Sequence, residues 1–156
     1  MKNTVVNASK NKQGTTTRLA AQILKDLDHQ TIHLIDHHVD QLGQRSEQDE
    51  FFKIMKKVDH PDILVIGTPV YWSGMTGYLK TFIDRLTDTM DEHLDSTEAP
   101  FNGTKLVLIV QGTAPQDAIP GIETVIKHIC QRFFMDYQGL VTTPIEAWKM
   151  NEKLSK

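Results

Sequence analysis

The chain has 156 residues, of which 39% are hydrophobic and 24% are charged, and its formal net charge is −3. That length fits one domain, residues 1–156, with a substantial core. The mildly negative net charge gives no indication of a basic surface that would bind nucleic acid. The single cysteine, Cys130, excludes a disulfide framework and a thiol-based zinc site within one chain. No apolar run is long enough to span a membrane and residues 1–10 are too polar for a signal peptide, so we expect a cytoplasmic protein.

The first predicted elements are a short strand at residues 4–8, a polar loop at 9–17 and a helix. The helix has an apolar face formed by Leu19, Ala20, Ile23, Leu24 and Leu27. Free amides at its start, the helix dipole and the hydroxyls of Ser9, Thr15 and Thr16 would suit an anion such as phosphate. Taken alone, the stretch is explained equally well by a helix-capping loop with nothing bound.

The next segment predicts a strand at Thr31–Ile35 and a helix after residue 50. His37 and His38 lie between aspartates, but neighbours on an extended segment point to opposite sides, so a solvated loop is favoured over a metal site. The sequence Ser46-Glu47-Gln48-Asp49 resembles a capping box. The helix that follows is expected to bury Phe51, Phe52, Met55 and Val58.

The stretch from Ile63 to Arg85 is the most informative. Ile63–Ile66 is continuously apolar, as in a strand covered on both faces, and Gly67 and Pro69 are expected to end it. Tyr71-Trp72-Ser73-Gly74 follows, and Thr76 can cap a helix whose apolar stripe contains Leu79, Phe82, Ile83, Leu86 and Met90. Aromatic side chains beside exposed amides suit a flat heteroaromatic ligand, although they could also seal the sheet or a dimer interface.

The remaining chain continues the alternation of strands and helices. Residues 91–103 are expected to form a surface loop, Lys105–Gln111 a strand, and residues 112–115 a loop rich in small residues. Pro120 fits the first turn of a helix whose stripe contains Ile122, Val125, Ile126, Ile129, Cys130 and Phe133, so Cys130 is interpreted as a buried structural thiol. A strand at 135–141 and a short helix within 144–156, with Trp148 packing on the body or a partner, complete the chain.

This alternation predicts an α/β fold, a doubly wound, five-stranded parallel sheet of order 2-1-3-4-5 with helices on both faces. In that order the loops after strands one, three and four, at residues 9–16, 69–76 and 112–119, lie side by side at the switch point. The first loop offers a phosphate site, the second aromatic side chains and the third glycine amides. Together they would suit a phosphorylated aromatic cofactor.

The segment PVYWSGMTGYLKTFIDR, residues 69–85, closely resembles the P-V-Y-W-x-x-M-S-G-x-L-K-x-F-I-D-R signature of NAD(P)H-dependent FMN reductases of the flavodoxin-like superfamily. Ser9, Gly14 and Thr16 also match the family's G-S-P-R-x-x-G-N-T phosphate loop. The chain departs from that loop at Asn7-Ala8, Asn11 and Thr15. It also lacks the cysteine cluster with which some relatives hold an iron–sulfur centre after the second strand.

The resemblance implies bound FMN, with no catalytic side chain and no metal. Its phosphate would be held by Ser9, Gly14, Thr15 and Thr16, its isoalloxazine would lie on Pro69, Val70, Tyr71, Trp72, Ser73 and Gly74, and its pyrimidine edge would meet Gly112 and Thr113. It further implies an oxidoreductase in which hydride passes from NADH or NADPH to the flavin and on to a small acceptor such as a quinone, a nitro or azo compound, or free flavin. A homodimer is implied as well.

Three other classes of protein are excluded because the residues that they require are missing. A receiver domain needs acidic residues where Asn7 and Ala8 stand, a P-loop NTPase needs Gly-Lys-Ser/Thr after Gly14, and a low-molecular-weight phosphatase needs a cysteine in the first loop. The serious rival is a flavodoxin-type electron carrier, and the net charge of −3 is mild for a protein that docks on basic partners. An FMN-binding protein without turnover is the third alternative.

Overall fold

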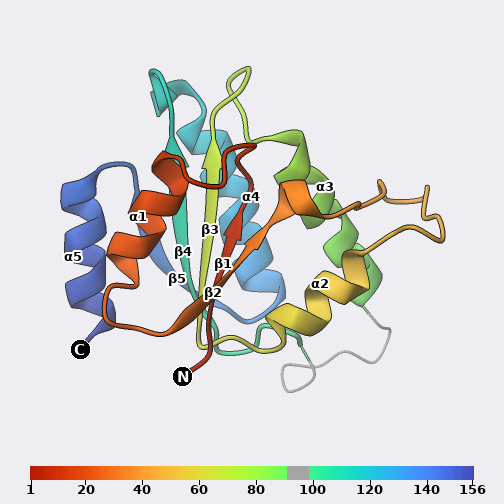
Figure 1. The fold of residues 1–156 in the computed structure, drawn as a ribbon, viewed down its shortest axis with the longest axis horizontal. Coiled ribbons are helices and arrows are strands. Elements are labelled where there is room, and N and C mark those ends of the chain that lie inside the picture. The colour runs from red at the N-terminus through yellow and green to blue at the C-terminus, as the bar shows by residue number, and fades with distance from the viewer. Residues whose placement is uncertain (91–98) are drawn as a thin grey trace.

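The computed structural model describes residues 1–90 and 99–156, and its centre is a parallel sheet of five strands (Figure 1). The sheet order is β2-β1-β3-β4-β5, as the sequence predicted, with each neighbouring pair parallel. The strands are β1 (Asn3–Asn7), β2 (His29–His33), β3 (Ile63–Pro69), β4 (Lys105–Gln111) and β5 (Asp136–Val141).

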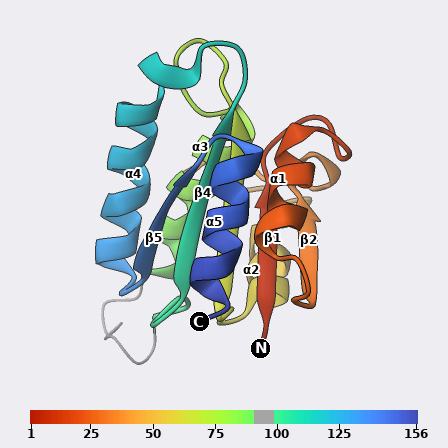
Figure 2. The ribbon, with the colours of Figure 1, turned by 90° about the vertical axis from the view of Figure 1, so that its left-hand side faces the viewer.

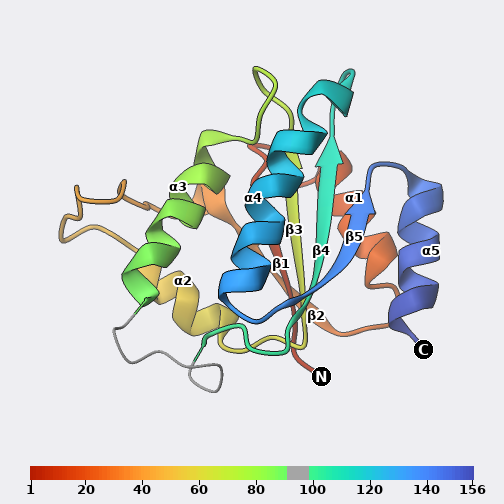
Figure 3. The same ribbon diagram turned by 180° about the vertical axis from the view of Figure 1, so that it is seen from behind.

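Helices cover both faces of the sheet, which confirms the doubly wound α/β fold (Figures 2 and 3). One face carries α1 and α5, and the other carries α2, α3 and α4. The helices are α1 (Thr15–Ile23), α2 (Phe51–Val58), α3 (Gly77–Arg85), α4 (Ile119–Arg132) and α5 (Pro144–Leu154), with short 3-10 turns η1 (Leu34–Asp36), η2 (Leu86–Thr89) and η3 (Pro115–Asp117). None of the helices in the described part of the chain is long and apolar enough to cross a membrane.

The central strand β3 contributes to the core on both faces of the sheet, because successive side chains of a strand point to opposite faces. In β3, Leu64 and Ile66 pack with α2, α3 and α4, whereas Ile63 and Val65 pack with α1 and α5. All four side chains are buried. The continuous apolar run at 63–66 is therefore the signature of a strand with helices on both sides.

The boundaries of β1 and β5 differ from the prediction by one residue, and those of β3 and β2 differ by more. β3 continues past Gly67 to Pro69, because Gly67 and Thr68 still pair with Ile109 and Val110 of β4. β2 pairs with the whole of β1, from His29 beside Asn3 to His33 beside Asn7, so it starts and ends two residues earlier than expected. The chain then turns through η1.

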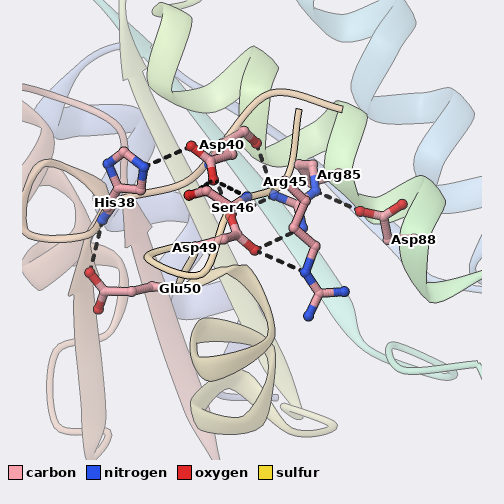
Figure 4. A network of polar contacts seen from close by, with 8 residues as sticks. All are labelled: His38, Asp40, Arg45, Ser46, Asp49, Glu50, Arg85 and Asp88. Atoms are coloured by element: carbon pink, nitrogen blue, oxygen red, sulfur yellow. Dashed lines mark hydrogen bonds and ion pairs between the residues drawn. The ribbon is translucent and has the colours of Figure 1, made fainter. Parts of the chain in front are cut away.

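The predicted capping box at Ser46–Asp49 is wrong, because its polar groups serve a different network (Figure 4). The amide and hydroxyl of Ser46 both donate to the carboxylate of Asp40, at 2.7 and 2.6 Å. Asp49 accepts two hydrogen bonds from the fully buried Arg85 guanidinium, at 2.6 and 2.9 Å. Arg85 also donates to Asp88 at 2.6 Å and stacks 4.8 Å from the ring centre of Phe51. This network anchors the 37–50 segment to the end of α3.

The buried faces of two helices differ from the predicted stripes. In α2 the buried residues are Phe51, Ile54 and Val58, so Ile54 is buried although it was not predicted to be. Phe52, which was predicted to be buried, is 40% exposed, and Arg45 lies above its ring. After α3, Met90 is exposed, although the other predicted stripe residues are buried. Thr76 caps α3 as expected, accepting a hydrogen bond from the Leu79 amide at 3.3 Å.

The predicted surface loop at 91–103 is partly wrong. Ala99 and Phe101 are buried, and Phe101 packs edge-on against Phe133 with ring centres 5.8 Å apart. The part of that prediction that concerns residues 91–98 lies outside the described residues. The C-terminal helix is confirmed as α5, capped by Thr143, and its Trp148 is half exposed with Lys25 5.6 Å from the ring centre.

Candidate functional site

The loops after β1, β3 and β4 meet at the carboxyl end of the sheet and are joined by hydrogen bonds (Figure 1). The Thr76 hydroxyl donates to the carbonyl of Ala8 at 2.8 Å, which links the second loop to the first. The Val70 amide donates to the carbonyl of Gln111 at 3.0 Å, and the Ser73 hydroxyl donates to the carboxylate of Asp117. These contacts bring together the three loops that the predicted strand order placed side by side.

The first loop is organised by Asn7, the last residue of β1, which is fully buried. Its Oδ1 accepts from the Ser9 amide at 3.0 Å, and its Nδ2 donates to the carbonyl of Asn11 at 3.2 Å. The Oγ of Ser9 accepts from the Asn11 amide at 3.0 Å, which leaves its hydroxyl hydrogen to donate elsewhere. The loop is therefore shaped by side chains at its base before any ligand arrives.

The first turn of α1 presents backbone donors at the end of this loop. Gly14 is the N-cap residue, and no side chain within the described residues caps the helix. Since the first amides of an α-helix have no intrahelical partner, the N–H groups of Thr15, Thr16 and Thr17 are available to an acceptor. The Thr15 hydroxyl is exposed and accepts from Arg18 at 3.2 Å. Uncapped amides and a helix dipole form a donor set suited to an anion.

Thr16 also fixes how closely α1 packs on the sheet. Its side chain is completely buried, and its Oγ1 accepts from the Gln111 side chain at 3.3 Å. A Cβ added to Gly67 would lie 2.2 Å from the Thr16 Cγ2. Gly67 is thus needed for the close approach of the α1 terminus to β3, a role that its position inside a strand could have suggested.

The second loop forms a tight turn at Tyr71–Gly74. Tyr71 and Gly74 exchange two backbone hydrogen bonds of 3.1 Å, and Trp72 and Ser73 between them have φ values of 51° and 57°. Both central residues are thus left-handed, as in a type I′ turn, although neither is glycine or asparagine. The Trp72 side chain is fully exposed and Tyr71 is half exposed, while Pro69 and Val70 lie at the buried base.

The third loop begins with Gly112 and Thr113, both exposed. Gly112 has a φ of 137°, and a Cβ there would lie 3.5 Å from the Val70 amide nitrogen. Glycine is favoured by this backbone conformation. Ala114 is left-handed as well, with a φ of 49°, and η3 follows with Asp117. The Ser73–Asp117 contact holds this loop beside the aromatic turn, a contact that the sequence analysis missed.

Other reactive groups lie away from these loops. His37 contacts Glu50 at 3.2 Å and His38 contacts Asp40 at 2.7 Å, so each histidine faces a carboxylate of the 37–50 segment. The described residues contain no cluster of three or more acidic, histidine or cysteine side chains that could hold a metal ion. Cys130 is buried in α4, as predicted, and burial raises its pKa to about 11.

A five-stranded parallel sheet of this order, with its functional loops after β1, β3 and β4, defines a flavodoxin-like α/β protein. The family model described as NADPH-dependent FMN reductase matches residues 1–129. The chain belongs to this family. It is therefore an FMN-dependent oxidoreductase that uses NAD(P)H as its reductant, and the prediction of an enzyme rather than an electron carrier is confirmed.

Individual relatives and solved structures resemble the chain to different extents. YwqN of Bacillus subtilis, named as an NAD(P)H-dependent FMN-containing oxidoreductase, is 29% identical over 153 residues, which cover 90% of this chain and 83% of YwqN. An iron–sulfur flavoprotein of Archaeoglobus fulgidus is 35% identical over 97 residues, 54% of this chain and 48% of that protein. The solved structure of an FMN-dependent NADH-azoreductase from Bacillus anthracis in complex with FMN matches with a TM-score of 0.65 and 14% identity, covering 99% of this chain and 98% of that one.

Proposed function

We propose that FMN lies across the three joined loops, with its phosphate at the start of α1. The isoalloxazine lies along residues 69–74, and its pyrimidine edge faces Gly112 and Thr113. One observation carries this proposal: hydrogen bonds connect the first loop to the second through Thr76 and Ala8, and the second to the third through Ser73 and Asp117. A ligand with a phosphate at one end and a flat ring system at the other matches the order of the donor and aromatic groups.

The donor set at α1 fits a phosphate. The uncapped amides of Thr15 and Thr16 follow Gly14, the Thr15 hydroxyl lies beside them, and the Ser9 hydroxyl belongs to the start of the same loop. Because the Thr16 hydroxyl is buried against Gln111, Thr16 contributes its amide rather than its side chain. Hydrogen bonds to a charged group are worth about 1.5–3 kcal/mol each, so a few of these donors account for tight phosphate binding.

The aromatic turn and the third loop would contact the isoalloxazine ring. FMN held there would supply the redox chemistry, accepting hydride from NADH or NADPH and passing electrons to an acceptor. The amides of Gly112 and Thr113 would stabilise negative charge at the pyrimidine edge, because backbone dipoles held in place by the fold need no reorganisation. Tyr71 and Trp72 would provide an apolar surface for the ring. No side chain is required as a general acid or base.

We propose a small acceptor such as a quinone, a nitro or azo compound, or free flavin. The aromatic turn is an open surface with Trp72 fully exposed, so a flat acceptor can reach the ring. The azoreductase named above shares the fold and acts with FMN and NADH, which supports this class of acceptor.

We also propose a homodimer that works in the cytoplasm, where NAD(P)H is supplied. A fully exposed tryptophan at the tip of a turn is costly in water and is typical of a contact surface. A hollow of about 540 Å³ with an apolar floor lies between α3 and α4 and gives a second surface for a partner copy. A partner copy that covered Trp72 would close the open side of the site.

Absorbance spectroscopy tests the proposal. The purified protein, after titration with FMN, is expected to show a perturbed flavin spectrum that NADH or NADPH bleaches under anaerobic conditions. A protein that takes up no FMN would contradict the binding site, and bleaching by dithionite alone would contradict the reductase activity.

Sedimentation at micromolar concentration measures the dimer, and Trp72→Ser is expected to weaken it.

A further inference from the structure

We propose that His33 is a positioning residue for the phosphate loop: its unprotonated Nδ1 accepts a hydrogen bond from Asn7, and protonation of His33 releases the loop. This inference rests on the proposed FMN site and adds a proton-controlled element to it. His33 is the last residue of β2 and lies opposite Asn7 in the parallel register of β1 and β2.

The orientation of the Asn7 amide is fixed by backbone groups whose roles are not interchangeable. Oδ1 lies 3.0 Å from the Ser9 amide, which can only donate. Nδ2 lies 3.2 Å from the Asn11 carbonyl, which can only accept. A flipped amide would place like groups against each other at both positions. Nδ2 is therefore the atom that faces His33.

The hydrogen-bonding role of His33 follows from that orientation. Nδ2 of Asn7 and Nδ1 of His33 are 3.0 Å apart, and Nδ2 has only hydrogens to offer. Nδ1 must then carry a lone pair, so the ring is neutral with its proton on Nε2. A second proton on Nδ1 would place N–H against N–H. The Asn7 side chain would have to turn away, and the contacts to Ser9 and Asn11 would be lost with it.

The charged groups around His33 also connect it to the loop. Lys12, in the phosphate loop, pairs with Asp36 of η1 at 2.6 Å. Asp36 raises the pKa of His33 and Lys12 lowers it, but burial is the largest influence and the net shift is downward. His37 interacts with Asp36 as well. If His33 gained a proton, it would compete with Lys12 for Asp36, which weakens a second attachment of the loop to the end of β2.

The affinity for FMN should consequently depend on the protonation of His33. If only the neutral form holds the loop in its binding geometry, affinity falls by up to tenfold for each pH unit below the pKa of His33. The FMN phosphate also takes up a proton near pH 6. Variants of His33 separate protonation of His33 from protonation of the FMN phosphate, because the phosphate titrates in the same way whichever variant is used.

The experiment measures the FMN dissociation constant between pH 7.5 and 4.5 in four proteins. His33→Asn places an amide oxygen at the position of Nδ1 and cannot be protonated, so it is expected to match the wild type at pH 7.5 and to bind FMN more tightly at pH 5. His33→Phe removes the acceptor and is expected to bind weakly at every pH. His29→Asn, at the other end of β2, is the matched control and should follow the wild type. Identical pH profiles for the wild type and His33→Asn would overturn the proposal.

Nitrogen NMR of the protein without FMN provides a readout that does not depend on the proposed cofactor site. The ring of His33 is expected to show an unprotonated Nδ1 and a protonated Nε2 at pH 7.5, and the amide signals of Ser9 and Asn11 should titrate with it. A proton on Nδ1 at pH 7.5, or loop amides that do not follow the ring, would overturn the proposal. If the NMR result holds while no FMN binds at any pH, the proposed function fails and the role of His33 in positioning the loop stands.

Discussion

The phosphate loop and the aromatic turn lie at the same edge of the sheet and are built in opposite ways. The phosphate loop rests on the buried side chains of Asn7 and Ser9, which pair with its own backbone. The aromatic turn extends into solvent, with Trp72 fully exposed and two non-glycine residues in the left-handed region. The first region is organised by the fold and the second is strained and open. Binding of the phosphate should therefore depend on groups that also stabilise the fold, whereas contact with substrates should not.

The Arg85 network provides a control that is remote from both regions. Arg85→Met removes the guanidinium from Asp49 and Asp88, while Asp49 keeps the Asp40 amide at 2.9 Å and Arg45 at 3.8 Å. Loss of one member of a buried ion pair costs about 3–5 kcal/mol. We expect the free energy of unfolding, measured with urea, to fall by that amount. The FMN dissociation constant of the folded fraction should stay within about twofold of the wild type. A large loss of FMN affinity would mean that the loops are not independent of this end of α3.

Asn7→Leu tests the phosphate loop. It leaves the Ser9 amide and the Asn11 carbonyl without partners, and each unsatisfied buried group costs about 1–3 kcal/mol. We expect a loss of about 2–4 kcal/mol in unfolding free energy together with weaker FMN binding. Asn3→Leu, at the other end of β1, is the matched control, because Asn3 is also buried but donates to the Asp28 carbonyl, in the connection between α1 and β2 rather than in the phosphate loop. Equal effects of the two variants on FMN affinity would remove the special role of Asn7.

Acid should weaken the Arg85 network at a lower pH than the phosphate loop. The Arg85 guanidinium lowers the pKa of Asp49 to about 2, below its ordinary value of 3.8. The stabilisation is thus complete above pH 4 and is lost as the pH falls from about 4 to 2, with a total of roughly 2 kcal/mol. Urea unfolding between pH 5 and 2.5 should show a smaller pH dependence in Asp49→Asn than in the wild type. The same pH dependence in both proteins would contradict the assignment.

Trp72→Asn tests the aromatic turn and has the smallest expected effect on folding. Asparagine adopts the left-handed conformation more readily than tryptophan, so we expect the unfolding free energy to rise by about 0.5–1 kcal/mol. The loss of an aromatic contact worth about 0.5–1.5 kcal/mol should weaken flavin binding by about two- to tenfold. Trp148→Phe on α5 is the control and should leave flavin binding unchanged. A Trp72→Asn protein that is less stable than the wild type and binds FMN normally would show that the aromatic turn supports the fold rather than the ligand, which contradicts the comparison of the two regions.

The sequence predicted most of the fold because its signals are local. The apolar runs at β3 and β4, the Thr76 cap and the stripe of α4 depend on neighbours within a few residues, and the structure contains all of them. The juxtaposition of the three loops followed from the strand order. Resemblance to a family named the cofactor, which no local pattern could have done.

The failures involve partners that are distant in sequence. Ser46 and Asp49 looked like a capping box because their true partners include Arg85, which is far along the chain. Phe101 looked exposed because its packing partner, Phe133, directly follows the last residue of α4 and is distant in sequence. The sequence did not identify Asn7 as the residue that organises the first loop, since its contact with His33 depends on the register of β1 and β2. In each case the missing information was a tertiary contact.

The central claim, that the loop after β1 holds the FMN phosphate, is tested most directly by comparing FMN with riboflavin in the wild-type protein. The two ligands differ only by the phosphate, and two charge-assisted hydrogen bonds of about 1.5–3 kcal/mol each amount to at least about a hundredfold in affinity. Titration at pH 7.5, monitored by flavin fluorescence, should show FMN binding at least that much more tightly than riboflavin. Equal affinities for the two flavins would contradict the account.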